Sequence, residues 1–338
     1  MKTKKILILF IAASLTVNVY SQISLGGKPY SWQVSDQNGR TTFKGKVTAL
    51  KNIDNDIEIV NAKKLQAKCK NCQEYYGKGI DQKLDIKKAG EKIDVPGGKI
   101  WLVRFESPSA LGMQFYFNKY KLPNNASLFI YNEDKSTLLG AFTHINNHVN
   151  EKFATQEIYG KTIILEYFEA DQNEFEGQLE IFKVIHIFNS AQHRSGTGGV
   201  GQAAPCTKDI NCAEGNNYQT IKKSVCRIST YDKVLDMTGY CSGFLVNNIQ
   251  LNGQRMSYVM TANHVLSSDQ HPFPGAKILD RFDYWIFAFG LEKSSCGSIL
   301  YPIPNGSHSG ANLIARSDFS DYLLLDLQVN KIENFIPV

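Results

Sequence analysis

The segment YVMTANH (258–264) decides both the fold and the chemistry that we expect of this chain. Its first residues form an apolar run typical of a buried β-strand. Its last residues are two small side chains followed by Asn263 and His264, at the point where such a strand should end. A lone histidine at a strand end is more often a hydrogen-bonded structural residue than a catalytic one, so the rest of the chain must decide its role.

Two further segments, one on each side of His264, complete a pattern. Upstream, CSGFLV (241–246) predicts a strand with a glycine inside it. Downstream, DYLLLDL (321–327) places Asp321 just before a buried strand, with Leu324 and Leu325 at its third and fourth following positions. In this order and at this spacing, the three segments resemble the first half of a trypsin-like serine protease.

The resemblance implies that His264 is a general base and that Asp321 orients it. A histidine with a pKa of about 6.5 can take a proton from a serine hydroxyl and later return it. A carboxylate on the other ring nitrogen fixes the tautomer and stabilises the imidazolium. We expect the apolar strand after Asp321 to bury that carboxylate beside the ring. Asp318, in Ser317-Asp318-Phe319, is the alternative to Asp321 and is otherwise a solvated turn residue.

The third member of such a triad is missing from the sequence. In this fold the serine follows the aspartate along the chain, but residues 322–338 contain no serine and no GDSGG segment occurs anywhere. Ser307 and Ser309 precede Asp321, in a predicted loop. A two-barrel protease domain needs on the order of 200 residues, more than residues 206–338 supply. We therefore expect a partial domain, the first β-barrel only, which is truncated before its nucleophile and inactive by itself.

Within the trypsin-like class, residues 206–330 look most like bacterial lysyl endopeptidases. The features that carry this resemblance are the Cys206–Cys212 spacing followed by Glu214-Gly215, the LVNN run at 245–248, and Tyr284-Trp285 leading to Cys296. A softer resemblance links the LPNNASLFIY (122–131) and GAFT (140–143) runs to the pro-region of such enzymes. Cleavage after lysine stays open, because no lysine lies between Lys183 and Lys208 and only Arg194 could direct a basic-residue cut there.

The upstream region also has a β-type texture. Short branched and aromatic runs between residues 100 and 188 are separated by turn residues, which predicts an antiparallel β-sandwich over about 95–190. The segment SGTGGVGQAAP (195–205) has the small residues of a linker. The expected fold is thus all-β, with a pro-region over 22–194 and the partial protease domain after the linker.

The first residues favour export. Lys2, Lys4 and Lys5 precede a short apolar run, which predicts a cleaved signal peptide over residues 1–21; an N-terminal membrane anchor is the alternative. No later stretch is long enough for a transmembrane helix. The net charge of +5 comes from scattered lysines and predicts no nucleic-acid partner. The histidine spacing suits no metal site, no cofactor is expected, and the expected partners are protein or peptide substrates.

An exported chain can hold disulfides, and this one has seven cysteines, an odd number. Cys69 and Cys72 form a CxxC pair, for which a local disulfide is favoured over redox chemistry or half a zinc site. The family resemblance implies a Cys212–Cys296 bridge and a Cys206 whose partner is absent. The family's cysteine after the histidine is replaced here by Val265, so Cys226 is the expected substitute partner of Cys241.

Two other functions compete with a protease precursor. The sandwich could belong to a secreted, non-enzymatic binding or adhesion module that carries a degenerate half protease domain, and an apolar face left open on that half domain would then need a partner. A thiol oxidoreductase at Cys69 and Cys72 is the third hypothesis.

Overall fold

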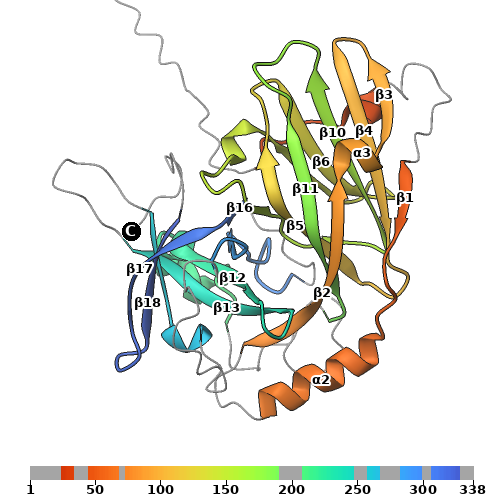
Figure 1. Ribbon diagram of the computed structural model, residues 1–338. Helices are drawn as coiled ribbons and strands as arrows, with labels where there is room; N and C mark the ends of the chain where they lie inside the picture. The colour runs from red at the N-terminus through yellow and green to blue at the C-terminus, as the bar shows by residue number, and fades with distance from the viewer. Residues whose placement is uncertain are drawn as a thin grey trace, which may run out of the picture.

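The structure is a computed structural model that describes residues 24–33, 45–67, 73–189, 208–246, 257–266, 282–298 and 306–327. The predicted signal peptide, the predicted linker and Cys69, Cys72 and Cys206 lie outside these residues. About half of the described residues lie in β-strands and few lie in helices, which fits the all-β class (Figure 1). The described helical segments include α2 (Asn55–Ala67), α3 (Ile86–Ala89), a helical turn at residues 30–33, and the 3-10 turns η1 (His144–Asn146), η2 (Ala213–Tyr218), η3 (Ile221–Ser224) and η4 (Asn263–Val265). No helix in the described ranges has the length and apolarity to cross a membrane.

The first sheet has six strands, all from the N-terminal part of the chain. They are β1 (Lys46–Ala49), β3 (Glu91–Val95), β4 (Gly98–Glu106), β6 (Ala126–Asn132), β7 (Leu138–Phe142) and β10 (Thr162–Ala170). The order is β1-β4-β10-β6-β7, and β3 shares the edge of β4 with β1. The β1–β4 pair is parallel and the others are antiparallel.

The second sheet has twelve strands and extends through both parts of the chain. Its N-terminal strands are β2 (Glu74–Asp85), β5 (Gly112–Lys121), β8 (Phe153–Ala154), β9 (Ile158–Tyr159) and β11 (Gln178–Ile187). Its C-terminal strands are β12 (Val225–Asp232), β13 (Met237–Val246), β14 (Tyr258–Thr261), β15 (Ile286–Phe289), β16 (Gly306–Ser309), β17 (Ala311–Ser317) and β18 (Tyr322–Leu327).

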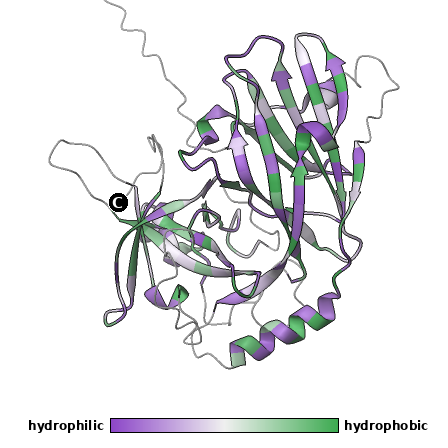
Figure 2. Ribbon diagram, viewed as in Figure 1, coloured by the Kyte–Doolittle hydropathy of each residue, from purple (hydrophilic) through white to green (hydrophobic). Residues whose placement is uncertain are grey.

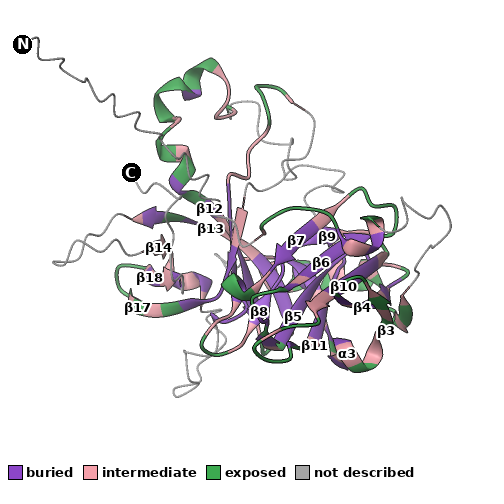
Figure 3. Ribbon diagram, turned by 90° about the horizontal axis from the view of Figure 1, so that it is seen from above, coloured by how far each residue is buried: buried purple, intermediate pink, exposed green. Residues whose placement is uncertain are grey.

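The N-terminal strands of the two sheets share one hydrophobic core. Phe105, Ile130 and Leu165 of the first sheet lie in the same buried cluster as Phe115 and Val184 of the second. Buried residues are concentrated in these strands (Figure 3), and each strand mixes apolar and hydrophilic residues (Figure 2), as expected of a sandwich. The two sheets thus share a core over the range for which a sandwich is expected, and β1, β2 and β3 add strands from residues 46–95, for which the sequence pattern predicts none. We call the described residues 45–189 the N-terminal β-domain.

The described residues from 208 to 327, here called the C-terminal half, have a second core. Ile228, Leu245, Val259, Phe287 and Leu325 are among its buried members. The strands follow the path β16-β15-β12-β13-β14-β18-β17. The predicted closed barrel is not present in the described strands, because β16 and β17, at the two ends of the path, pair only with β15 and β18. Gly310, with φ +85°, turns the chain between these two strands so that each joins a different neighbour.

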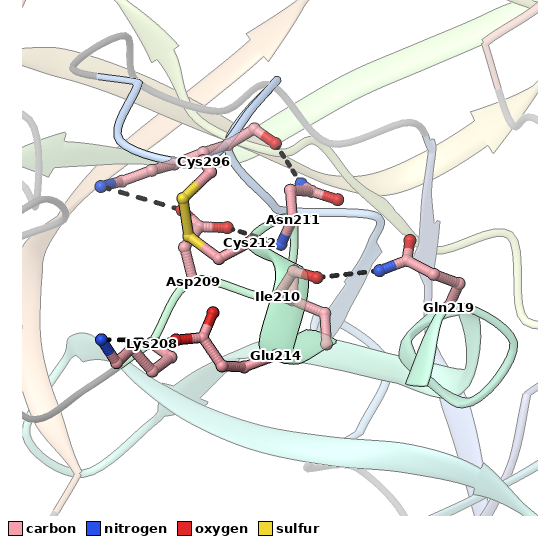
Figure 4. Close-up of a disulfide and its surroundings, with 9 residues drawn as sticks. Lys208, Asp209, Ile210, Asn211, Cys212, Glu214, Gln219 and Cys296 are labelled. Carbon is pink, nitrogen blue, oxygen red and sulfur yellow. Dashed lines mark hydrogen bonds and ion pairs between the residues drawn. A yellow bond between two sulfur atoms is a disulfide. The ribbon is translucent and has the colours of Figure 1, made fainter. Parts of the chain in front are cut away.

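The cysteines give one confirmation and one correction. Cys212 and Cys296 form the predicted disulfide, next to the hydrogen bond from Gln219 Nε2 to Ile210 O (2.8 Å) (Figure 4). Cys226 and Cys241, predicted to pair, are both free. The strand register explains this, because Cys226 lies opposite Gly243 and Cys241 lies opposite Ile228. The two cysteines are thus diagonal neighbours, about 7 Å apart or more at Cα, where a disulfide requires backbone movement.

Replacing both Cys212 and Cys296 by alanine should lower the free energy of unfolding by about 4 to 5 kcal/mol, because the bridge closes a long loop in the unfolded chain. The two cysteines are 84 positions apart. Urea unfolding followed by circular dichroism measures the change. Dithiothreitol should move the wild-type midpoint to that of the variant and leave the variant unaffected. If dithiothreitol leaves the wild-type unfolding midpoint unchanged, the assignment of the Cys212–Cys296 disulfide is contradicted.

Candidate active site

Strand pairing brings His264 and Asp321 together. Strand β14 lies between β13 and β18, and its last residue, Thr261, is opposite Leu323 of β18. Because this pair is antiparallel, the chain leaving β14 runs beside the chain entering β18. His264, in η4, and Asp321, just before β18, are therefore neighbours although they are 57 positions apart.

Asp321 holds the histidine by two hydrogen bonds. The ring Nδ1 lies 2.7 Å from Asp321 Oδ2, and the backbone N of His264 donates to Oδ1 at 2.8 Å. The backbone N of Asn263 also donates to the Asp321 carbonyl oxygen at 3.2 Å. When Nδ1 keeps its proton and donates it to the carboxylate in a hydrogen bond, Nε2 carries the free lone pair of the neutral ring. The structure thus places the two residues in contact, and their catalytic roles stay a prediction.

The carboxylate is charged and open to water. The hydrogen bond from the His264 ring, followed by the one from its backbone, lowers the pKa of Asp321 below the ordinary value. The Asp321 side chain is 48% exposed and that of His264 is 39% exposed. The expectation that the following strand buries the carboxylate is wrong for the described residues. Strand β18 points Leu323 and Leu325 into the core, whereas Asp321 lies in the turn before it.

Asp318, the alternative partner, does not contact the ring. It accepts a hydrogen bond from Asn263 Nδ2 at 2.6 Å and lies 3.7 Å from Arg316. Asp318 therefore supports the residue next to His264, a contact that the sequence pattern did not indicate.

An apolar hollow adjoins the dyad. It has a volume of about 660 Å³ and includes Asp321 in its wall. Three of its apolar side chains are about half exposed, Ile221 (50%), Val225 (48%) and Phe244 (45%). Met260, Ala262 and Tyr322 complete what we call the dyad-side apolar face. A contiguous exposed apolar patch of this kind often marks a site where another molecule binds.

No serine in the described ranges is hydrogen-bonded to His264. Ser307 and Ser309, expected in a loop, lie instead in strand β16. The Ser309 hydroxyl accepts a hydrogen bond from the backbone N of Ala154 at 2.9 Å and is buried. The structure therefore gives these two serines a place in the sheet and none at the dyad.

The other described histidines occupy different settings. His186 is fully buried between Ser107 Oγ, 2.8 Å from Nδ1, and Asn55 Oδ1, 2.8 Å from Nε2. Burial lowers the pKa of His186 to about 4 and that of His308 to about 3. Within the described ranges, no group of three or more His, Cys, Asp or Glu could hold a metal ion. His193 and His271 lie outside these ranges.

Comparison with known families identifies the C-terminal part of the chain. Residues 200–336 match the family model described as lysyl endopeptidase, C-terminal domain. Residues 200–336 are thus similar to lysyl endopeptidases. The match confirms the predicted relationship for these residues and indicates a protease family with peptide substrates. The match does not extend into the N-terminal β-domain, whose resemblance to a pro-region stays a prediction.

In a His264→Ala variant, the pKa of Asp321 should rise towards the ordinary value of about 3.9, because the largest cause of its lowering is removed. The rise should be partial, since the backbone hydrogen bond remains. A carboxyl ¹³C NMR titration measures it. An unchanged pKa would mean that the Nδ1–Oδ2 bond does not form in solution.

Stability should fall as the pH drops from about 6.5 to about 4, and His186 should account for part of this. The pKa of His186 is lower in the folded chain than in the unfolded chain. As the pH falls, the unfolded chain therefore binds the proton first, and the free energy of unfolding decreases. His186→Gln should reduce the slope of unfolding free energy against pH by about one proton in this window. The control is His144→Gln, which removes an exposed histidine and leaves the hydrogen bonds of His186 in place. Equal slopes for wild type and His186→Gln would contradict the prediction.

Proposed function

We propose that this chain is the precursor part of a secreted serine endopeptidase, with His264 as general base and Asp321 as the carboxylate that orients it. The observation that carries the proposal is the pair of hydrogen bonds from His264 to one carboxylate, through Nδ1 and through the backbone N. The family match over residues 200–336 supports the same reaction class. The predicted signal peptide over residues 1–21 supports export.

In this proposal each group has a step in peptide hydrolysis. Nε2 of His264 takes the proton of a serine hydroxyl as the oxygen attacks the scissile carbonyl carbon. The imidazolium then gives that proton to the leaving amine nitrogen, and a water molecule repeats the sequence to release the acid product. Asp321 keeps Nδ1 protonated throughout and stabilises the charged ring.

The serine belongs, in this proposal, to a segment outside the 338 residues. That segment would dock on the dyad-side apolar face, where Ile221, Val225 and Phe244 offer half-exposed apolar surface beside Asp321. Docking would also remove water from the Asp321 carboxylate. Electrostatic interactions strengthen when water is excluded, so the dyad would gain its full effect only in the docked state.

The substrate class is a protein or peptide with a basic residue before the cut bond. The family match favours lysine at that position. Arg194 leaves arginine open, because it is the only basic residue between Lys183 and Lys208, where a cut would separate the two parts of the chain. The side chains that select the residue before the cut bond are not part of the dyad.

A binding module is the second candidate, and the dyad-side apolar face is the observation that favours it. In that case the face docks a different protein and the histidine has no catalytic duty. His264→Ala would then leave partner binding and all biological activity unchanged.

The 338-residue chain should show no peptidase activity, because a base and its aspartate cannot form an acyl-enzyme without a nucleophile and oxyanion donors. Hydrolysis of a peptide ester by the purified chain measures this. Turnover that a serine-directed inhibitor abolishes would show that the chain holds its own nucleophile.

In a longer product of the same gene that supplies the serine, His264→Ala should lower kcat/KM for a lysyl peptide by about 10⁴-fold or more. Asp321→Asn should lower it by about 10⁴-fold, since the wrong tautomer then faces the serine. Asp318→Asn is the matched control, one turn away on the same loop, and should cost less than about tenfold. A severe Asp318 variant beside a mild Asp321 variant would overturn the assignment of the carboxylate.

A further inference from the structure

The N-terminal β-domain and the C-terminal half share backbone hydrogen bonds. Strand β13 pairs with β2, with Met237 opposite Lys78 and Tyr240 opposite Glu74. The backbone N of Gly79 also donates to the carbonyl oxygen of Asp236 at 2.8 Å. The two parts therefore form one continuous sheet, a stronger connection than side chains alone would make (Figure 1).

The two glycines of β2 make this approach possible. A Cβ at Gly77 would collide with Thr238 and Ile185, and a Cβ at Gly79 would collide with the Asp236 carboxylate. Both glycines have ordinary negative φ, so their role is close contact and not a special backbone shape. The surface of the N-terminal β-domain is thus fitted to this partner.

A buried ion pair crosses the same boundary. Glu157, between β8 and β9, lies 2.7 and 2.9 Å from Nη2 of Arg227 on β12, and the two side chains are 4% and 15% exposed. The Arg227 guanidinium also lies 4.5 Å from the ring centre of Tyr240. Removing one partner of such a pair leaves the other charge buried without compensation, so the pair holds the two parts in one register.

Two further carboxylates of the C-terminal half receive donors from the other side. Lys183 Nζ lies 2.8 Å from Asp236. Lys152 Nζ and Asn150 Nδ2 lie 2.6 and 2.7 Å from the two oxygens of Asp283, which is buried. These contacts extend the polar connection over much of the boundary.

Aromatic side chains fill the space between the charged contacts. The ring of Tyr76 stacks on that of Tyr240, with centroids 3.8 Å apart. Tyr116, fully buried, stacks on Tyr284 at 5.2 Å and meets Tyr231 edge-on at 5.3 Å. Stacked pairs add to the apolar area that they bury. The boundary therefore has the composition of a stable interface, with an aromatic centre and satisfied charges.

The dyad lies on a different surface. All residues that line the hollow beside Asp321 belong to the C-terminal half. Ile221, Val225 and Phe244 stay about half exposed with the N-terminal β-domain in place, and the His264 side chain is 39% exposed. The domain thus occupies the β13–β2 boundary and leaves the dyad-side apolar face free.

We propose that the N-terminal β-domain is a lasting, non-blocking partner of the C-terminal half. When the chain is cut between residues 190 and 207, the two pieces stay bound through the β2–β13 interface and the dyad-side apolar face remains open. The inference needs no catalytic step, so it stands or falls independently of the proposed function.

The test uses the full chain with a recognition site for an unrelated protease inserted within residues 195–205. After complete cutting, size-exclusion chromatography and native mass spectrometry at about 1 µM should show one species that contains both pieces. At this concentration, pieces with a Kd of about 1 µM would be largely separate. Two separate, folded species under these conditions would overturn the proposal.

Variants separate a specific interface from loose adhesion. Glu157→Gln should weaken the association of the cut pieces by about 100-fold, and Gly79→Val should separate them through the clash with Asp236. The matched control is Glu106→Gln, which removes a carboxylate that pairs with Arg104 inside the N-terminal β-domain and should leave association unchanged. If Glu157→Gln and Glu106→Gln behave alike, the ion pair does not hold the pieces.

The open face is tested on the same cut complex with diethyl pyrocarbonate, which modifies accessible imidazoles. Peptide mapping should find His264 modified, while the buried His186 and His308 stay protected as internal controls. Protection of His264 that ends when the pieces are separated would show that the domain covers the dyad, contrary to the proposal.

Discussion

The structure depends on the way in which strand β13 divides one edge between two partners. Along its other edge, β13 pairs with β12 from Met237 to Phe244. On the shared edge, Met237 to Tyr240 pair with β2, and Phe244 to Val246 pair with β14. The first half of the strand therefore attaches the N-terminal β-domain, and the second half sets the position of the strand that leads to His264. A shift of β13 by one residue would disturb both, because every side chain would change face.

Two carboxylate pairs of similar length differ in what surrounds them. Glu157 and Arg227 are 2.7 Å apart in a nearly dry boundary, and Asp321 and His264 are 2.7 Å apart in contact with water. Breaking the buried Glu157–Arg227 pair would leave a charge without water or a partner, which is costly. This pair therefore fixes the relative position of the two parts. In the wet pair solvent screens the attraction, so its two hydrogen bonds orient the ring without contributing much to the stability of the fold. The same chemistry thus serves assembly in one place and orientation in the other.

Local sequence signals predicted the dyad well, because His264 and Asp321 each adjoin an apolar strand whose pattern is visible in a few residues. The signals failed where the answer depends on register between distant segments. Cys226 and Cys241 lie on adjacent strands, as inferred, but the pairing offset by two residues separates them. Strand β2 was missed because EYYGKGIDQKLD is polar and rich in glycine, and its partners β11 and β13 are far away in sequence. The exposure of Asp321 could not be read from the leucines that follow it, since burial depends on what packs above a residue and not on its neighbours in the chain.

The edge that β2 presents to β13 has a consequence for the order of folding. Residues 74–85 are synthesised well before residues 237–246, so the N-terminal β-domain can form while this edge still has unpaired backbone donors and acceptors. Such an edge attracts strands of other chains. Glu74 and Lys78 place a negative and a positive charge along it, and Gly77 and Gly79 lower its intrinsic strand propensity. The free edge of β2 should thus bind strands of other chains only weakly. The sheet is completed when β13 of the same chain pairs with this edge.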